Sequence, residues 1–284
     1  MRQSLQKKID YSIDLMRKAE KLALQYDNEN GFYLAFSGGK DSQTLYHLAL
    51  LAGVKFKAHM NLTSVDPPDV IRFVKRNYPD VELIKPKMSI YDMAIKKHFL
   101  PTRLFRWCCA EFKEISGGGT VTLLGIRRQE SLKRSKRNEV ETSDKKYSGN
   151  FDQFEEHREK MVTCVKGKDK IMVSPILDWT ERDVWEFLNE VVKVPHCELY
   201  DKGFRRIGCI CCPMSSKSQK LKEIAIYPHV KRNWIRVLQK LIEYGHITRN
   251  INDAEFGFNW WISGKDFDTF YADEVLQQKI DFEE

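Results

Sequence analysis

The segment "AFSGGKDSQTLYHL", from Ala35 to Leu48, decides the fold of this chain. An apolar run ends at Phe36, two glycines and a lysine follow, and a helical pattern begins directly after them. Glycine permits the tight turn that joins a strand to a helix. Such a turn directs backbone N–H groups and the positive end of the helix dipole at one point, where an anion is stabilised. The segment therefore predicts a strand, a phosphate-binding turn and a helix N-terminus, in that order.

Strand and helix patterns continue to alternate after this segment. The helix closes at Gly53, "VKFKAHMNL" reads as a second strand, "PPDVIRFVKRNYP" as a helix and "VELIKP" as a third strand. A fourth strand is expected in "GGGTVTLLGIRR". Strands that alternate with helices predict βαβ units and a parallel sheet. We therefore expect an α/β fold with a doubly wound, mostly parallel, Rossmann-like sheet, followed by a Cys-rich loop and a helical appendage.

Three parts are expected along the chain. Residues 1–26 form a docking helix, because their apolar residues recur on one helix face. Residues 27–194 form the nucleotide-binding α/β domain, in which Thr180 caps a helix. Within this domain, residues 138–170 are polar with little periodicity and are predicted to be a mobile excursion. Residues 195–284 contain the Cys-rich loop and the C-terminal helices.

Composition and charge narrow the class of protein. The chain has 284 residues and no apolar run long enough for a membrane span, and its N-terminus is charged throughout, unlike a signal peptide. A cytoplasmic location without a membrane partner is therefore predicted. The net charge of +7 fits an ordinary basic surface or a polyanionic partner, such as a nucleotide or a nucleic acid. The stretch "GIRRQESLKRSKRN", from Gly125 to Asn138, favours the polyanionic partner.

The residues that follow each strand are the candidates for nucleotide binding, because ligands of open parallel sheets bind beyond the carboxyl ends of the strands. The expected nucleotide-binding residues are Ser37, Gly38, Gly39, Lys40, Asp41, Ser42, Asp66 and Gly125. Lys40 supplies positive charge, and Asp41 either holds Mg²⁺ or caps the helix. Asp66 either binds the ribose or the metal, or starts the next helix.

Two arginines after the fourth strand complete the expected catalytic set. Arg127 and Arg128 can each bind two phosphate oxygens, with a structural ion pair as the alternative. Together with Lys40 and Asp41 they are the predicted catalytic residues.

The seven cysteines predict a metal site. Their number is odd and the chain is expected in the cytosol, so a disulfide framework is not expected. Cys209 and Cys212 form a C-x₂-C pair, Cys197 lies twelve residues before Cys209, and Cys108 and Cys109 lie far upstream. Four thiolates suit a [4Fe–4S] cluster or a structural Zn²⁺, and the spacing alone does not choose between them. Inert thiols are the alternative.

The order of the motifs resembles the PAPS-reductase family. "SGGKDS" differs from a Walker A loop and resembles the PP-loop of the adenine-nucleotide α-hydrolase superfamily, which includes ATP pyrophosphatases and phosphoadenylyl-sulfate (PAPS) reductases. R-x-C-C-x₃-K, G-I-R-R-x-E-S, D-W-x₃-D-V-W and L-Y-x₂-G-x₃-I-G-C-x₂-C-P follow it, and the resemblance extends roughly from Gly31 to Pro213. The subset with these cysteines includes iron–sulfur assimilatory reductases and the ATPase component of DNA-phosphorothioation systems.

This resemblance implies the PP-loop ATPase type of α/β fold and a [4Fe–4S] cluster. The ligands that it implies are Cys108, Cys197, Cys209 and Cys212, with Cys109 as the alternative to Cys108. Family members that reduce a sulfonucleotide use a nucleophilic cysteine in a C-terminal tail, whereas this chain has no cysteine after Cys212. Cys164 is the only spare thiol far from the cluster motifs.

The expected function follows from the loop, the cysteines and the missing tail cysteine. We expect an enzyme that binds ATP or a PAPS-like adenine nucleotide with Mg²⁺ and cleaves it at the α-phosphate. This step would activate an acceptor, such as DNA or tRNA, for iron–sulfur-assisted transfer of sulfur from a cysteine-desulfurase-type donor. One alternative is a phosphoadenylyl-sulfate or adenylyl-sulfate reductase that releases sulfite. The other is a non-catalytic nucleotide-sensing subunit.

Overall fold

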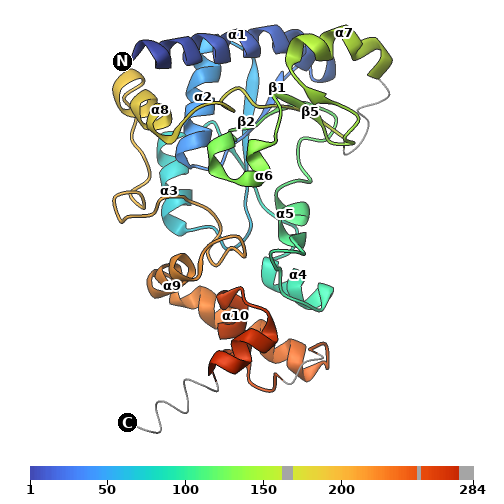
Figure 1. The fold of residues 1–284 in the computed structure, drawn as a ribbon, viewed down its shortest axis with the longest axis vertical. Coiled ribbons are helices and arrows are strands. Elements are labelled where there is room, and N and C mark those ends of the chain that lie inside the picture. Colours follow the sequence, from blue (N-terminus) through green and yellow to red (C-terminus); the bar gives the residue numbers. More distant parts are fainter. Residues whose placement is uncertain (162–168, 248–250, 275–284) are drawn as a thin grey trace. The chain divides into compact units, whose positions relative to one another are not determined.

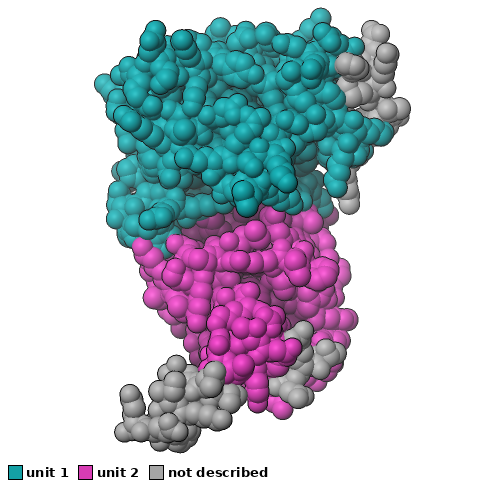
Figure 2. Space-filling model, in the orientation of Figure 1, with its two compact units in different colours: residues 1–61, 68–85, 114–207 teal, residues 62–67, 86–113, 208–284 magenta. Residues whose placement is uncertain are grey.

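The computed structural model describes residues 1–161, 169–247 and 251–274, and Figure 1 shows the order of the elements. The chain divides into two compact units (Figure 2). The first comprises Met1–Asn61, Pro68–Lys85 and Glu114–Ile207, and the second comprises Leu62–Pro67, Pro86–Lys113 and Gly208–Glu284. The three-part division expected from the sequence stays a prediction. Each of the two units is assembled from segments that alternate along the chain.

A seven-stranded sheet forms the centre of the first unit, in the order β3-β2-β1-β4-β7-β5-β6. The strands are β1 (Phe32–Ala35), β2 (Phe56–Asn61), β3 (Glu82–Ile84), β4 (Val121–Leu123), β5 (Val140–Thr142), β6 (Ser148–Gly149) and β7 (Ile171–Val173). The strands from β3 to β7 in this order are parallel, and β5 is antiparallel to both β7 and β6. The predicted α/β class and mostly parallel sheet are confirmed.

The sheet reverses its strand order between β1 and β4. From β1 the chain adds β2 and then β3 toward one edge, whereas β4 lies on the other side of β1. At such a reversal the loops after the two strands turn away from each other and leave room for a ligand. Because β1 and β4 are parallel neighbours, the loops that follow them lie at the same carboxyl edge of the sheet, on either side of this space.

The first unit also contains six helices and two short helical turns among its described residues. They are α1 (Gln3–Tyr26), α2 (Lys40–Ala52), α3 (Pro68–Asn77), α6 (Leu132–Ser135), α7 (Phe151–Met161) and α8 (Glu181–Glu186), with a 3₁₀ turn η1 (Arg128–Glu130) and a π-helical turn η2 (Phe187–Val191). The long helix α1, dark blue in Figure 1, contacts α2, β1 and β4. Its buried face includes Leu5, Ile9 and Met16. The amphipathic pattern of residues 1–26 therefore belongs to a helix whose apolar face is covered.

Residues 138–161 have more regular structure than their polar composition predicts. β5 joins the sheet beside β7, and α7 follows the β5–β6 pair. Phe151 and Phe154, two of the few large apolar residues there, are buried, and the backbone N–H of Phe151 donates to the Glu139 carboxylate at 2.8 Å. The expected absence of regular structure is not observed in this part, while its mobility stays a prediction. Cys164 lies outside the described residues.

The second unit is helical. Its helices are α4 (Ile90–Lys97), α5 (Trp107–Phe112), α9 (Lys217–Ile226), α10 (Pro228–Glu243) and α11 (Ala254–Ser263). Trp234 of α10 and Trp261 of α11 pack with ring centroids 5.0 Å apart, and the indole N–H of Trp261 donates to the Pro101 carbonyl at 2.7 Å. Apolar side chains of α4 and α5 join the same core. Within the described part of the chain, no helix in either unit is both long and apolar enough to cross a bilayer.

Candidate functional site

The loop between β1 and α2 has the shape that the sequence predicts. Gly38 has a φ of +70°, and a Cβ at this position would lie 2.8 Å from Cγ1 of Val70 in α3, so only glycine fits. The Ser42 hydroxyl accepts from the Ser37 N–H at 3.1 Å and donates to the Gly39 carbonyl at 2.9 Å. Ser42 therefore fixes the turn, and its single hydroxyl hydrogen is used within the loop.

Lys40 begins α2 at the end of this loop. Its side chain is only 4% exposed, and its ammonium donates to the Arg205 carbonyl at 3.1 Å and lies 3.5 Å from the Glu181 carboxylate. Its backbone N–H donates to the Tyr200 hydroxyl at 2.8 Å. Burial raises the pKa of Tyr200, which keeps the hydroxyl protonated at neutral pH. Lys40 is thus a fixed positive charge on the wall of the site, and Tyr200 is a loop partner that the sequence reasoning missed.

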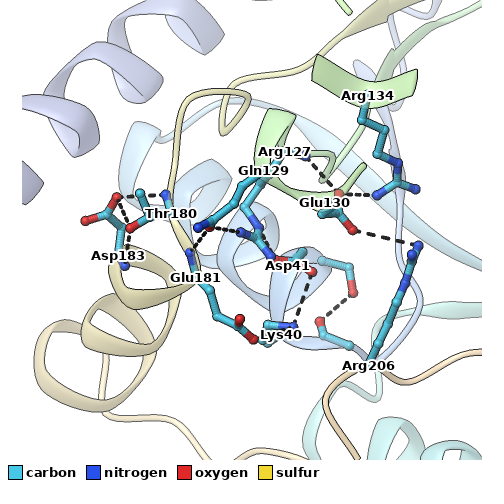
Figure 3. Close-up of polar contacts among 12 residues, drawn as sticks. Lys40, Asp41, Arg127, Gln129, Glu130, Arg134, Thr180, Glu181, Asp183 and Arg206 are labelled. Carbon is cyan, nitrogen blue, oxygen red and sulfur yellow. Dashed lines mark hydrogen bonds and ion pairs between the residues drawn. The ribbon is translucent and has the colours of Figure 1, made fainter. Parts of the chain in front are cut away.

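The loop after β4 meets the start of α2, as the strand order requires. Nε of Arg127 donates to Oδ1 of Asp41 at 2.6 Å, and Nζ of Lys40 lies 3.8 Å from the other carboxylate oxygen (Figure 3). A Cβ at Gly125 would lie 2.9 Å from the Asp41 carbonyl oxygen, so a side chain there would push the two segments apart. The structure therefore brings together Lys40, Asp41, Gly125 and Arg127.

A cavity of about 340 Å³ opens beside these residues. Its walls are Lys40, Arg127, Gln129, Glu130, Glu181, Arg205 and Arg206. Glu130 accepts from the Arg127 N–H at 2.9 Å, pairs with Arg134, and lies 3.7 Å from Nη2 of Arg206 (Figure 3). The sequence reasoning missed Arg205 and Arg206, although two adjacent arginines in a glycine-rich loop are a signal for anion binding.

Arg128 does not share this cavity. It pairs with Asp178 and donates to the Arg137 carbonyl at 3.2 Å. It lines a second cavity of about 390 Å³, together with Tyr11 and Trp179. Arg127 has an extended backbone, in which successive side chains point to opposite sides. The structure therefore separates the two arginines that the sequence pattern groups together.

Asp66 belongs to the second unit. Its carboxylate accepts from the Thr63 N–H, and its charge acts on Lys113 and Cys209. Thr63 itself lies beside Cys209, with Oγ1 and Sγ 3.3 Å apart. Within this unit Asp66 is therefore a neighbour of the cysteine motifs, and its expected contact with the ribose or with Mg²⁺ stays a prediction.

Four of the predicted cysteines gather in the second unit. Cys108 and Cys109 lie in α5, and the backbone N–H of Cys212 donates to the Cys209 carbonyl at 3.2 Å, which closes the C-x₂-C turn. A hydrogen bond with Cys109 and burial raise the pKa of Cys108, and the charges of Cys209 and Cys212 act in the same direction. Cys109, Cys209 and Cys212 therefore all lie close enough to Cys108 to act on its pKa.

Cationic and hydroxyl groups surround these thiols. The Arg106 guanidinium donates to the Cys109 sulfur at 3.0 Å, and Lys113 hydrogen-bonds to Cys209. The hydrogen bond from Cys108 and the Arg106 charge hold the pKa of Cys109 below that of an ordinary thiol. Burial raises the pKa of Cys209, and a thiolate there would in turn raise the pKa of Lys113. Cations therefore lie next to two of the four thiols, those of Cys109 and Cys209.

Two other cysteines have different surroundings. Cys197 lies in the first unit, fully buried, and burial raises the pKa of its thiol. Cys211 is also buried, and its backbone N–H donates to Glu223 at 2.7 Å. In the described ranges, no three His, Cys, Asp or Glu side chains are arranged to hold a single metal ion. The role of Cys197 as a ligand stays a prediction.

A model of a known protein family matches most of this chain. The phosphoadenosine phosphosulfate reductase domain matches residues 31–215, which include the loop, the arginines and the cysteine motifs. The chain belongs to this family. The resemblance drawn from the motifs is thereby confirmed, and membership supports adenine-nucleotide binding by a nucleotide-using enzyme.

The relatives of this chain are described with different functions. An uncharacterised protein of Methanocaldococcus jannaschii is 33% identical over 213 residues, which are 72% of this chain and 47% of that protein. An adenosine 5'-phosphosulfate reductase of Oceanobacillus iheyensis is 26% identical over 51% of this chain and 54% of its own length. A probable FAD synthase of Schizosaccharomyces pombe is 27% identical over 62% of this chain and 57% of its length. The chain thus spans about half the length of these relatives.

Proposed function

We propose that this chain binds ATP or a related adenine nucleotide beside the SGGKDS loop and breaks the bond between the α- and β-phosphates. One observation carries the proposal: the cavity at the carboxyl edge of the sheet has four cationic side chains in its walls, those of Lys40, Arg127, Arg205 and Arg206. Phosphoryl groups are bound and activated by such fixed positive charge. Membership in the reductase family supports the adenine nucleotide as the ligand.

The reaction needs charge stabilisation more than proton transfer. A nucleophile on the acceptor attacks the α-phosphorus, the bond to the bridging oxygen breaks, and pyrophosphate leaves with the electron pair. Lys40 and Arg127 stabilise the negative charge that grows on the leaving group. Asp41 holds the Arg127 guanidinium in place through its 2.6 Å hydrogen bond. Mg²⁺ is commonly bound by one carboxylate together with substrate phosphates, so Asp41 is also the residue that would hold it.

We propose that Cys108, Cys109, Cys209 and Cys212 hold a [4Fe–4S] cluster, with Zn²⁺ as the alternative. The nearness of Cys109, Cys209 and Cys212 to Cys108 and the cations beside Cys109 and Cys209 support this set. A bound cluster would supply a site that carries or positions sulfur for the activated acceptor. A cysteine-desulfurase-type protein is the proposed sulfur donor, DNA or tRNA the proposed acceptor, and the cytoplasm the proposed location.

A second candidate is supported by the relatives. Several are described as adenosine 5'-phosphosulfate reductases, which favours a sulfonucleotide as substrate and sulfite as product. The described residues carry no cysteine after Cys212 that would serve as the nucleophile of such a reaction. A nucleotide-sensing subunit, the third candidate, would bind the nucleotide without turning it over.

A product assay separates these candidates. Protein purified without oxygen is incubated with ATP and Mg²⁺, with and without DNA or tRNA, and AMP and pyrophosphate are measured. A parallel incubation with adenylyl sulfate and a dithiol, which supplies the two electrons that the reduction needs, is assayed for sulfite. We expect AMP and pyrophosphate in equal amounts, more with the correct acceptor, and a loss of about 100-fold in Lys40→Met. Sulfite release without ATP cleavage would establish the reductase, and binding without any product would establish the sensor.

A further inference from the structure

The cavity beside the loop has two kinds of positive charge. Lys40 and Arg127 are 3% and 4% exposed and are held by hydrogen bonds to the Arg205 carbonyl and to Asp41. The side chains of Arg205 and Arg206 are exposed at the rim of the same cavity. The first pair is therefore fixed in place, while the second pair is free to adjust to a ligand.

Arg205 and Arg206, the rim arginines, make few side-chain interactions in the described part of the protein. Arg206 lies 3.7 Å from Glu130 and is 64% exposed, and an exposed ion pair at this separation contributes little. Glu130 keeps two other donors, Arg134 and the Arg127 N–H, when Arg206 leaves it. The Arg205 side chain has no hydrogen-bond or ion-pair partner among the described residues. Both guanidinium groups are thus available to an anion.

The charge of the cavity favours a highly charged ligand. Four cationic side chains line the cavity against the carboxylates of Glu130 and Glu181, and Asp41 pairs with Lys40 and Arg127, which leaves one positive charge in excess before a ligand binds. A nucleoside triphosphate carries two further phosphates beyond the α-phosphate, whereas adenylyl sulfate carries there a single sulfate with one negative charge. Guanidinium groups bind phosphate oxygens in pairs, and the fixed charges and the rim lie around one space.

We infer that Arg205 and Arg206 bind the β- and γ-phosphates of a nucleoside triphosphate and select it over a sulfonucleotide. This inference rests on the proposed function, since it names the substrate class of the same site. Arg206 exchanges Glu130 for a phosphate when the nucleotide binds. Arg205 contributes in two ways: its carbonyl positions Lys40, and its side chain contacts the terminal phosphates.

Equilibrium binding by calorimetry tests the inference. The probes are AMP, adenylyl sulfate and the ATP analogue with a methylene group between the α- and β-phosphates, which the enzyme cannot cleave there. The test variant is Arg205→Gln/Arg206→Gln, in which the Arg205 carbonyl that holds Lys40 remains. The matched control is Arg72→Gln/Arg76→Gln on α3, which removes the same charge from exposed positions of the same unit outside the cavity.

We expect the wild-type protein to bind the ATP analogue more tightly than AMP or adenylyl sulfate. In the test variant the affinity for the analogue falls about tenfold for each arginine, as for a lost charge-assisted hydrogen bond, while the affinity for AMP stays within about twofold. The control variant keeps the preference. An unchanged preference in the test variant, or an equal loss in the control, overturns the inference and leaves the proposed function standing. A wild-type protein that binds none of the probes overturns both.

Discussion

Two neighbouring arginines, Arg127 and Arg128, show what a single residue position decides. Both follow β4, and the sequence pattern gives them the same role. The extended backbone at Arg127 places that side chain against Asp41, while Arg128 pairs with Asp178 in the other cavity. The motif alone does not distinguish them, because the direction of a side chain depends on the register of the loop.

This difference gives a prediction at the residue scale. Arg127→Gln should lower kcat/KM for ATP cleavage by about 100-fold, because it removes a charge at the leaving group and frees Asp41. Arg128→Gln is the matched control, with the same change of charge one residue away, and should stay within about threefold of the wild type. Steady-state kinetics measure both variants, and thermal unfolding checks that each is folded. Equal losses in the two variants would contradict the assignment of Arg127 to the site.

At the scale of elements, local patterns were sufficient for some parts and insufficient for others. The strand, loop and α2 were predicted correctly because Gly38, Gly39 and the apolar spacing are local signals. β5 and β6 were missed, because short polar strands form through pairing with β7, which lies far along the chain. Arg205 was missed for the same reason, since its relation to Lys40 exists only in the folded chain.

The junction of α1 with α8 depends on one buried carboxylate. Asp183 is 2% exposed, caps α8 through Thr180, and forms ion pairs with Arg2 and Lys8 of the N-terminal segment. Burial alone would raise the pKa of Asp183, but the hydrogen bonds from Lys8, Thr180 and Arg2 outweigh it and hold the pKa well below the ordinary value. The ionised carboxylate therefore connects the two helices.

Asp183→Asn should lower the free energy of unfolding by about 3 kcal/mol at neutral pH, because two cations lose a buried partner. A depressed pKa stabilises the fold fully above the unfolded value of about 3.9, and this stabilisation is lost as the pH falls through the folded value. The gap between variant and wild type should therefore narrow below about pH 4 in urea unfolding. Asp178→Asn, which removes a mostly exposed ion pair, should change the unfolding free energy by less than about 1 kcal/mol. A gap that is constant with pH would contradict this role of Asp183.

At the scale of the whole molecule, the order of the motifs predicted the family, and the three-part division of the chain stays a prediction. Residues 62–67 and 86–113 fold with the C-terminal helices, as the shared core of Ile90, Trp107 and Trp234 shows. An apolar pattern reveals which face is buried but not which distant segment covers it. The position of Cys108 near Cys209 and Cys212 follows from this long-range packing, and therefore the spacing of the cysteines left the ligand set open.

The cysteine motifs predict the metal content of the protein. Protein purified without oxygen should be brown and contain about four irons per chain. Cys109→Ser should lose iron, because Cys109 shares its surroundings with Cys108, Cys209 and Cys212. Cys197→Ser tests the set that the family resemblance implies, in which Cys197 takes the place of Cys109.

Metal analysis, the visible spectrum and thermal unfolding separate the possible ligand sets. If Cys197→Ser loses iron and Cys109→Ser keeps it, the set with Cys197 that the family resemblance implies is correct. Colourless protein with one zinc would replace the cluster by a structural ion and remove the sulfur-carrying role. Iron loss in Cys109→Ser should also lower the thermal stability of the second unit, because a metal centre that ties α5 to the Cys209–Cys212 turn contributes its binding energy to folding. The first unit, which holds the nucleotide cavity, should still bind AMP in that variant, so loss of the cluster would leave nucleotide binding while ending sulfur transfer.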